Sequence, residues 1–150
     1  MKLGDLIRVF AEKVGIENVP ATEGMWKFSA DGNVFGVTGD ETGEKVWIYG
    51  DIASPDPGRR AALLKAAMEA NYFHRGTGGA TFSLNPDTGA LTLFDSRRLD
   101  ALDEKEFFSF VEAFVNSLAT WNAIGESGAR AAEEETADPK PGAFPDAMLV

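Results

Sequence analysis

The order of two hydrophobic periodicities along the chain restricts the folds it can adopt. Apolar residues recur at helical spacing in three segments, residues 3–14, 58–73 and 103–125. Short runs typical of strands lie between them, at residues 24–30, 33–39, 44–51, 79–85 and 90–95. The predicted order is α-β-β-β-α-β-β-α. Because single strands do not alternate with single helices, we predict an α+β fold with a five-stranded antiparallel sheet and three helices rather than a parallel sheet.

Turn and capping residues mark the ends of these segments. Asp31-Gly32 predicts a tight hairpin turn between the first two strands. Asp56 is expected to cap the second helix, and Asp103 with Glu106 fits a capping box at the start of the third. Gly125 is predicted to end the third helix. These local signals agree with the periodicities.

Composition and charge restrict the class of protein. A chain of 150 residues with 44% hydrophobic residues can form one ordinary domain, which we place at residues 1–125. Residues 126–150 hold six acidic residues, two basic residues and three prolines, and we predict a disordered acidic tail. The net charge of −10 argues against nucleic acid or an anionic membrane as a partner. No apolar run reaches the roughly 18 residues of a membrane span, and the N-terminal stretch does not fit a signal peptide, so a cytoplasmic protein is expected.

The triplet Asp87-Thr88-Gly89 is the string that carries the catalytic aspartate of aspartic proteases, one copy per chain in the small dimeric enzymes. A catalytic aspartate follows directly after a buried apolar strand, where two like charges can share one proton. Here Asn85-Pro86 precede the triplet, and an alternating strand begins directly after it. Proline, aspartate and glycine at these positions are what a short hairpin loop requires. We therefore interpret residues 85–89 as a turn.

Other motifs for catalysis or metal binding are weak. The glycine-rich residues 76–79 run from a helix into a strand, which is the reverse of a phosphate-binding loop. His74 is the single histidine and cysteine is absent, so a transition-metal site is improbable. No serine motif has an accompanying base. The sequence predicts no catalytic, cofactor-binding or metal-binding residue, and we expect a protein that is not an enzyme and needs no cofactor.

The third strand is apolar on both of its sides. Val46 and Ile48 point to one face, and Trp47 and Tyr49 point to the other. If helices cover the sheet on one side only, aromatic side chains are exposed on the opposite face. Exposed apolar surface of this kind usually marks a site for another chain, although a second layer or a dimer mate could also cover it.

The sequence resembles the class I type III secretion chaperones, the small acidic proteins that include the Tir chaperone. The resemblance spans about residues 3–124. It is carried by "VWIYGDI" at the end of the meander, by "RRAALLKAAMEANYF", by "GTGGATFSLNPDTGALTLF", and by "LDALDEKEFFSFVEAFVNSLATWNAI". The order and spacing of these pieces and the acidity of the chain together carry the resemblance.

The resemblance implies a cytosolic bacterial homodimer without enzymatic activity. Such a chaperone binds the N-terminal region of a secreted effector in extended form and keeps it soluble and competent for secretion. The helix at 58–73 and its neighbouring strand then resemble the dimer surface, with Leu63, Leu64, Ala67, Met68, Asn71 and Phe82 as its expected residues. The first helix and first three strands resemble the client-binding part, with Trp26, Phe28, Phe35, Val37, Trp47 and Tyr49 as expected contacts. Alternate residues among these must point inward.

Two other functions remain open from the sequence. A dimeric scaffold or regulatory domain of the same fold would bind a folded protein partner. A dimeric aspartic protease would use Asp87. The sequence names neither a client nor the open face of the sheet.

Overall fold

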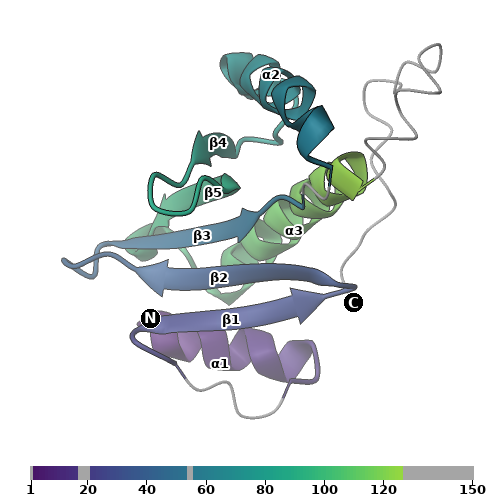
Figure 1. Ribbon diagram of the computed structural model, residues 1–150. Coiled ribbons are helices and arrows are strands. Elements are labelled where there is room, and N and C mark those ends of the chain that lie inside the picture. Colours follow the sequence, from purple (N-terminus) through teal and green to yellow (C-terminus); the bar gives the residue numbers. More distant parts are fainter. Residues whose placement is uncertain (1, 17–20, 54–55, 127–150) are drawn as a thin grey trace.

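The computed structural model of the protein describes residues 2–16, 21–53 and 56–126 (Figure 1). The helices are α1 (Leu3–Lys13), α2 (Arg60–Asn71) and α3 (Glu104–Glu126). Three short 3-10 turns are η1 (Pro57–Arg59), η2 (Tyr72–His74) and η3 (Leu99–Ala101). The strands are β1 (Met25–Ala30), β2 (Asn33–Gly39), β3 (Lys45–Asp51), β4 (Thr81–Leu84) and β5 (Leu91–Arg98). The predicted α+β order is confirmed.

All five strands form one antiparallel sheet in the order β1-β2-β3-β5-β4. The meander β1–β3 and the hairpin β4–β5 are joined through the pairing of β3 with β5. In this register Tyr49 lies opposite Phe94, and Ile48 lies opposite Asp95. β1 and β4 are consequently the two edge strands.

Helices α1 and α3 lie together on one side of the sheet (Figure 1). Phe10 of α1 joins them to the sheet, because its ring lies edge-on to Phe28 at 5.5 Å and to Phe107 of α3 at 6.0 Å. Phe28 in turn stacks on Phe35 of the neighbouring strand at 5.3 Å. Burying these aromatic side chains supplies a large part of the apolar contact that holds α1, α3 and the meander together.

The predicted turn at Asp31-Gly32 is confirmed. Both residues have positive φ, 50° and 82°, as a type I′ hairpin turn requires. The right-handed twist of such a turn matches that of the two strands, so β1 and β2 pair from Ala30 and Asn33 onward. A glycine at the second position adopts this backbone without steric cost.

The loop of the second hairpin is also a turn, although a different residue organises it from the one expected. The side chain of Asn85, rather than that of Asp87, accepts a hydrogen bond from a backbone N–H two residues ahead, at 2.9 Å. The Gly89 N–H donates to the carbonyl of Asn85 at 2.7 Å and closes the loop. Asp87 itself is exposed. The prediction that residues 85–89 form a turn is therefore confirmed.

Helix α2 is held against the edge strand β4. The Phe82 N–H donates to the Asn71 side-chain oxygen at 2.7 Å, and the Asn71 amide donates back to the Phe82 carbonyl at 3.1 Å. Phe82 also lies edge-on to Trp121 of α3 at 4.7 Å. Strand β4 is thus fixed to α2 by two hydrogen bonds and to α3 by an aromatic contact.

The start of α3 is as predicted, and the helix runs through Glu126, the last residue described. The Asp103 carboxylate accepts a hydrogen bond from the Glu106 N–H at 2.7 Å, which is the expected cap. Gly125, predicted to end the helix, lies within it. A Cβ added at Gly125 would be 1.9 Å from the Ala53 carbonyl oxygen, so this glycine lets α3 approach the segment after β3.

Two further predictions concern membrane-spanning helices and the C-terminal tail. No helix within residues 2–16, 21–53 and 56–126 is both long and apolar enough to cross a membrane. The predicted disordered tail begins at residue 126, and residues 127–150 lie outside the described residues.

Candidate protein-binding surfaces

The face of the sheet opposite α1 and α3 carries no helix among the described elements. Strand alternation and register place Met25, Val34, Trp47, Tyr49 and Phe94 on this face. Val34 is 55% exposed, and the other four side chains are partly exposed. We call these five residues the open-face patch. It joins the three consecutive strands β1–β3 to β5, and the contacts of Tyr49 with Met25 and of Trp47 with Phe94 link its side chains into one apolar surface.

Two aromatic contacts shape the open-face patch. The Tyr49 ring lies across Gly36 of β2, where an added Cβ would meet the ring at 2.6 Å, and its hydroxyl contacts the Met25 sulfur. Trp47 packs against Phe94 at 6.1 Å between ring centroids. The absence of a side chain at Gly36 thus allows Tyr49 to lie flat on the sheet.

The phenol of Tyr49 is perturbed by its position. Partial burial, and then the negative charge of Asp51 on the same strand, raise the pKa of Tyr49 above its usual value of 10.0. Both causes disfavour the phenolate. Tyr49 is therefore held in its neutral form, whose hydroxyl contacts the Met25 sulfur.

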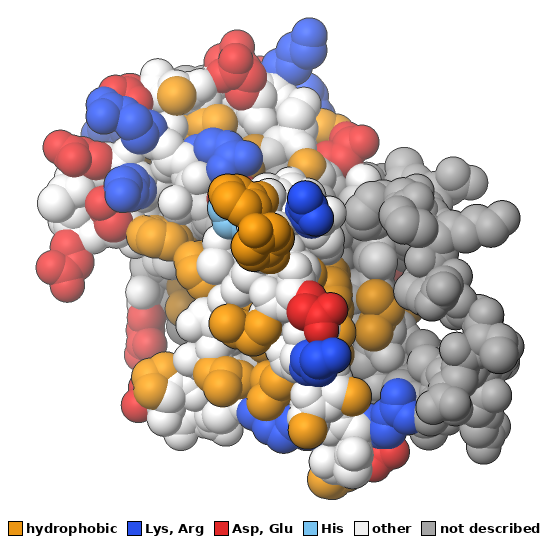
Figure 2. Space-filling model, turned by 90° about the horizontal axis from the view of Figure 1, so that it is seen from above, with side chains coloured by type: hydrophobic (Ala, Val, Ile, Leu, Met, Phe, Trp, Pro, Cys, Tyr) orange, Lys and Arg blue, Asp and Glu red, His pale blue; other side chains and the backbone are white. Residues whose placement is uncertain are grey.

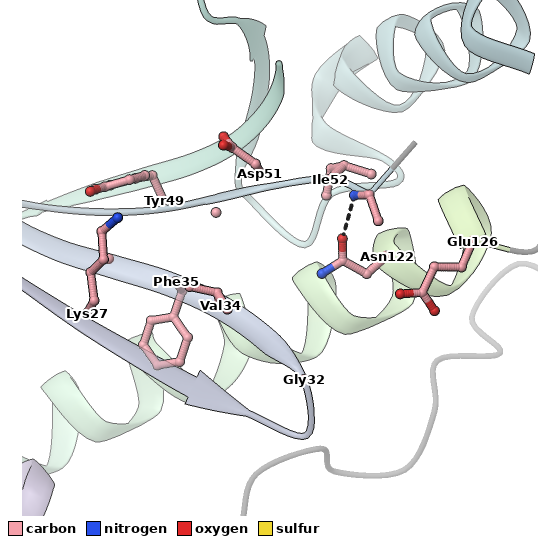
Figure 3. A pocket seen from close by; sticks show the side chains of 12 residues that line it. Lys27, Gly32, Val34, Phe35, Tyr49, Asp51, Ile52, Asn122 and Glu126 are labelled. Carbon is pink, nitrogen blue, oxygen red and sulfur yellow. Dashed lines mark hydrogen bonds between the residues drawn. The ribbon is translucent and has the colours of Figure 1, made fainter. Parts of the chain in front are cut away.

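A shallow pocket of about 280 Å³ opens at one end of this face (Figure 3). Tyr49 and Val34 line it from the sheet, and Asn122 and Glu126 line it from the last turns of α3. The Ala53 N–H donates to the Asn122 side-chain oxygen at 2.9 Å, as the dashed line in Figure 3 shows. The pocket therefore lies where the open face meets the end of α3.

The six residues predicted to bind a client divide between the two faces of the sheet. Trp47 and Tyr49 lie on the open face, as the two-sided character of their strand indicated. Phe28, Phe35 and Val37 are buried under α1 and α3. The sixth, Trp26, lies on the same helix-covered face and packs at the margin of the core. In this arrangement, Trp47, Tyr49 and the partly exposed Trp26 can contact another chain without the core opening, whereas the three buried residues cannot.

A second exposed apolar surface lies on α2 and β4. Met68 is 67% exposed and Phe73 is 80% exposed, and Tyr72 and Leu84 are also exposed. We call these four residues the α2 surface. Figure 2, which views the molecule from the side where α2 lies in Figure 1, shows hydrophobic side chains gathered near the centre of this side, next to lysine and arginine side chains.

The backbone at Phe73 presents its side chain outward. Phe73 and His74 both have positive φ, 50° and 54°, a conformation rare for residues other than glycine. The Tyr72 ring packs edge-on against Phe73 at 4.6 Å, and the Arg75 guanidinium lies over Tyr72 at 5.5 Å. A strained turn that exposes a large aromatic side chain points to a functional surface rather than to stability.

The six residues predicted for the dimer interface mostly serve the protomer itself. Leu63, Ala67 and Phe82 are buried in the core. Asn71 holds β4 through the two hydrogen bonds described above. The two remaining residues, Leu64 and Met68, are half-buried and exposed, respectively.

Sequence reasoning missed several residues of both surfaces. Met25, Val34 and Phe94 were not among the expected client contacts, and Tyr72, Phe73 and Leu84 were not among the expected dimer contacts. Tyr72 continues the stripe of Leu64 and Met68, so helical spacing could have identified it. Phe73 could not be found in this way, because its exposure depends on the left-handed turn.

The described residues hold no group of three or more His, Asp or Glu side chains that could bind a metal ion. His74 is exposed at the end of η2, and its Nε2 lies 3.2 Å from the Thr81 hydroxyl.

Comparison with known proteins identifies a family. The model of the Tir chaperone protein (CesT) family matches residues 5–122 of the sequence. This range contains all the strands and helices of the domain except the first residues of α1 and the last of α3. No curated protein matches the sequence significantly.

Solved structures share the fold at low sequence identity. A chain of the HopA1–SchA chaperone–effector complex superposes with a TM-score of 0.63 at 13% identity, covering 80% of this chain and 92% of that one. A chain of the ExsC–ExsE complex gives 0.62 at 16% identity, with 83% and 96% covered. YbjN of E. coli, described as a putative transcription regulator, gives 0.53 at 14% identity, with 84% and 91% covered. At these identities the likeness shows the fold alone.

Proposed function

Because the chain belongs to the Tir chaperone protein (CesT) family, we propose that it is a type III secretion chaperone that binds the N-terminal region of a secreted effector. One observation carries the proposal. The open-face patch leaves three aromatic side chains, a methionine and a valine without a covering helix in the described chain. One of the structures with the same fold is that of a chaperone–effector complex, which supports this reading.

The shape of the open-face patch suits an extended client. The patch is flat because Gly36 lets Tyr49 lie on the sheet, and it crosses four strands. An extended segment can place alternate side chains on such a surface, and its backbone can pair with an unpaired sheet edge such as that of β1. A client held in this way keeps its apolar residues away from water without forming its own core. It therefore stays soluble and unfolded for export.

In this proposal the protein acts in the cytoplasm as a homodimer and performs no chemistry on its client. The α2 surface is the candidate for contact with the second copy, because Met68, Tyr72, Phe73 and Leu84 are its exposed apolar residues. Leu64 extends this surface from the same helix. Two copies that buried these side chains against each other would remove a patch that a soluble monomer rarely exposes.

Capture of a client tests the proposal. A tagged full-length chain is used to isolate proteins from the cytosol of its own bacterium, and the captured protein is digested with a protease in the complex. We expect a secreted protein whose N-terminal segment is protected from cleavage. If the captured protein is folded and its terminus remains cleavable, the protein is instead a dimeric scaffold or regulatory domain.

Substitutions locate the binding surface. Trp47→Ala removes an aromatic side chain worth about 1.5–3 kcal/mol when buried, so client affinity should fall about tenfold or more. Asp87→Asn is the matched control, because Asp87 is exposed in a hairpin loop, and it should bind the client as the wild type does. If Trp47→Ala binds the client as tightly as the wild type does, the open-face patch is not the client-binding surface.

A change on α2 tests the dimer. Phe73→Asp should convert a dimer into a monomer in light scattering while the far-ultraviolet circular dichroism spectrum stays that of the folded protein, because Phe73 is exposed in the protomer. A wild-type protein that is strictly monomeric at micromolar concentration would contradict the homodimer.

A further inference from the structure

The segment that follows α3 leaves the domain at the margin of the open face. Glu126, the last described residue of α3, lines the pocket together with Tyr49 and Val34 of the open-face patch. Asn122, one turn earlier, is tied to Ala53 at 2.9 Å and fixes this end of the helix (Figure 3). Residue 127 is therefore attached directly beside the apolar surface.

Basic side chains lie on the open face of an acidic protein. Lys27, Lys45 and Arg98 lie on this face, with Asp51 as the carboxylate on the same strands. Because Arg98 pairs with Asp100 at 2.6 Å, two cations, Lys27 and Lys45, stand against one anion, Asp51, on the strands of this face, and the Glu126 carboxylate lies at its margin. The whole chain has a formal charge of −10. An acidic segment with apolar residues is the ligand that this combination favours.

Residues 127–150 have the matching composition. They contain five acidic and two basic residues, a net charge of −3. The acidic residues are concentrated at residues 133–138, and large apolar residues follow in "GAFPDAMLV" at 142–150. Phe144, Met148 and Leu149 are the side chains in this stretch that could fill an apolar surface.

The connection is long enough to reach the whole patch. The sheet has five strands of up to eight residues, so its face measures roughly 25 Å in each direction. Seventeen residues separate Glu126 from Phe144. A polypeptide of that length reaches at most about 60 Å. The segment can therefore reach every residue of the patch at an effective concentration in the millimolar range.

From these observations we propose that residues 144–150 bind the open-face patch of their own chain and occupy it until a client displaces them. The competition with a client rests on the proposed function, whereas the docking itself does not. The segment would shield the apolar face of the client-free protein from other chains. If its intrinsic Kd is about 0.5–1 mM, docking weakens apparent client affinity about three- to tenfold.

A spin label tests the docking in the full-length protein. Because the chain has no cysteine, Ala143→Cys provides a single attachment site. The three tryptophan indole signals in an NMR spectrum then act as reporters. Trp47 lies on the open face, whereas Trp26 and Trp121 lie on the helix-covered side. We expect strong broadening of Trp47 and little of Trp121. Equal broadening of both, or none, would overturn the docking.

The apolar residues of the segment are tested by substitution. The double variant Phe144→Ser, Leu149→Ser should abolish the selective broadening of the Trp47 signal. The control double variant Ala131→Ser, Ala132→Ser, which changes residues between α3 and the docking segment, should preserve it. A mixing experiment tests whether the contact is within one chain. Isotope-labelled chains without a spin label are mixed with spin-labelled chains that carry no isotope label. If the Trp47 signal is then broadened as strongly as within one chain, the segment binds between chains and the within-chain assignment is overturned.

Client affinity separates this inference from the proposed function. The Phe144→Ser, Leu149→Ser variant should bind a captured client about three- to tenfold more tightly than the wild type. Unchanged affinity would overturn the competition. Selective broadening of Trp47 in a protein that captures no client would support the docking and contradict the proposed function, so the two failures are distinguishable.

Discussion

Two neighbouring glycines on opposite faces of the sheet provide a direct test of which face is packed. Gly50 of β3 points toward α3, and Gly36 of β2 lies under the Tyr49 ring on the open face. Neither has the left-handed backbone that requires glycine. Substitution by alanine at each position therefore changes packing on one face and not the allowed backbone conformation.

At Gly50 the added methyl group enters the core. Its Cβ would lie 2.7 and 2.9 Å from the two methyl carbons of Leu118 and 3.0 Å from the Val34 carbonyl oxygen. Carbon atoms prefer about 3.5–4.0 Å, so Leu118, which is fully buried, must move by about 1 Å. Overpacking of this kind costs about 1–3 kcal/mol. Reduced freedom of the unfolded chain offsets about 0.4–1 kcal/mol of that cost.

At Gly36 the obstacle is the end of a side chain on an open surface. The Tyr49 ring and hydroxyl lie 2.6 Å from the added Cβ, but the ring can swing into solvent. We expect the lost ring burial, about 1 kcal/mol, to be offset almost completely by the same unfolded-state term. Because both variants are Gly→Ala changes in strands, the difference between them isolates packing.

Thermal and urea unfolding followed by circular dichroism measure both variants. Gly50→Ala should lower the free energy of unfolding by about 1–2 kcal/mol and the melting temperature by about 3–9 °C, whereas Gly36→Ala should change it by less than about 0.5 kcal/mol. Gly36→Ala should nevertheless weaken client binding, because it displaces Tyr49 from the open-face patch. A Gly36→Ala protein less stable than Gly50→Ala would refute the assignment of the faces.

Two further predictions concern the region around the pocket. Asn122→Ala removes the acceptor of the Ala53 N–H and the donor to the buried Asn33 side chain, two hydrogen bonds of 2.9 Å each. The free energy of unfolding should fall by about 2–3 kcal/mol. An unfolding midpoint in urea equal to that of the wild type would show that water replaces the amide. Burial and the charge of Asp51 raise the pKa of Tyr49, so the neutral phenol stabilises the fold below pH 10, and this contribution is lost as pH rises through the elevated pKa. Asp51→Asn should lower the pKa of Tyr49, which ultraviolet titration of the phenol measures. An unchanged pKa would contradict the role of the Asp51 carboxylate.

Local signals in the sequence determined most of the secondary structure. Asp31-Gly32 specified a type I′ turn and Asp103 a helix cap, because a turn or a cap depends on a few adjacent residues. The two-sided apolar pattern of β3 also placed Trp47 and Tyr49 on the face opposite Val46 and Ile48. Alternation of this kind is a property of any strand.

The tertiary structure decided which face is covered and what lies together on the other. Alternation put Phe28, Phe35 and Val37 on one face, but only the packing of Phe10 and α3 made that face the core. The order β1-β2-β3-β5-β4 brought Phe94 beside Trp47, because long-range strand pairing depends on how the whole core closes rather than on neighbouring residues.

Gly125 is a single residue whose role also depends on long-range packing. Its sequence position indicated a helix end, whereas its function is to let α3 approach the Ala53 carbonyl oxygen, a contact between segments more than 70 residues apart. The sequence by itself determined the elements and the two sides of each strand, since these follow from adjacent residues. The open surface was decided by tertiary packing, since the same alternating strand can bury either side until helices cover one of them.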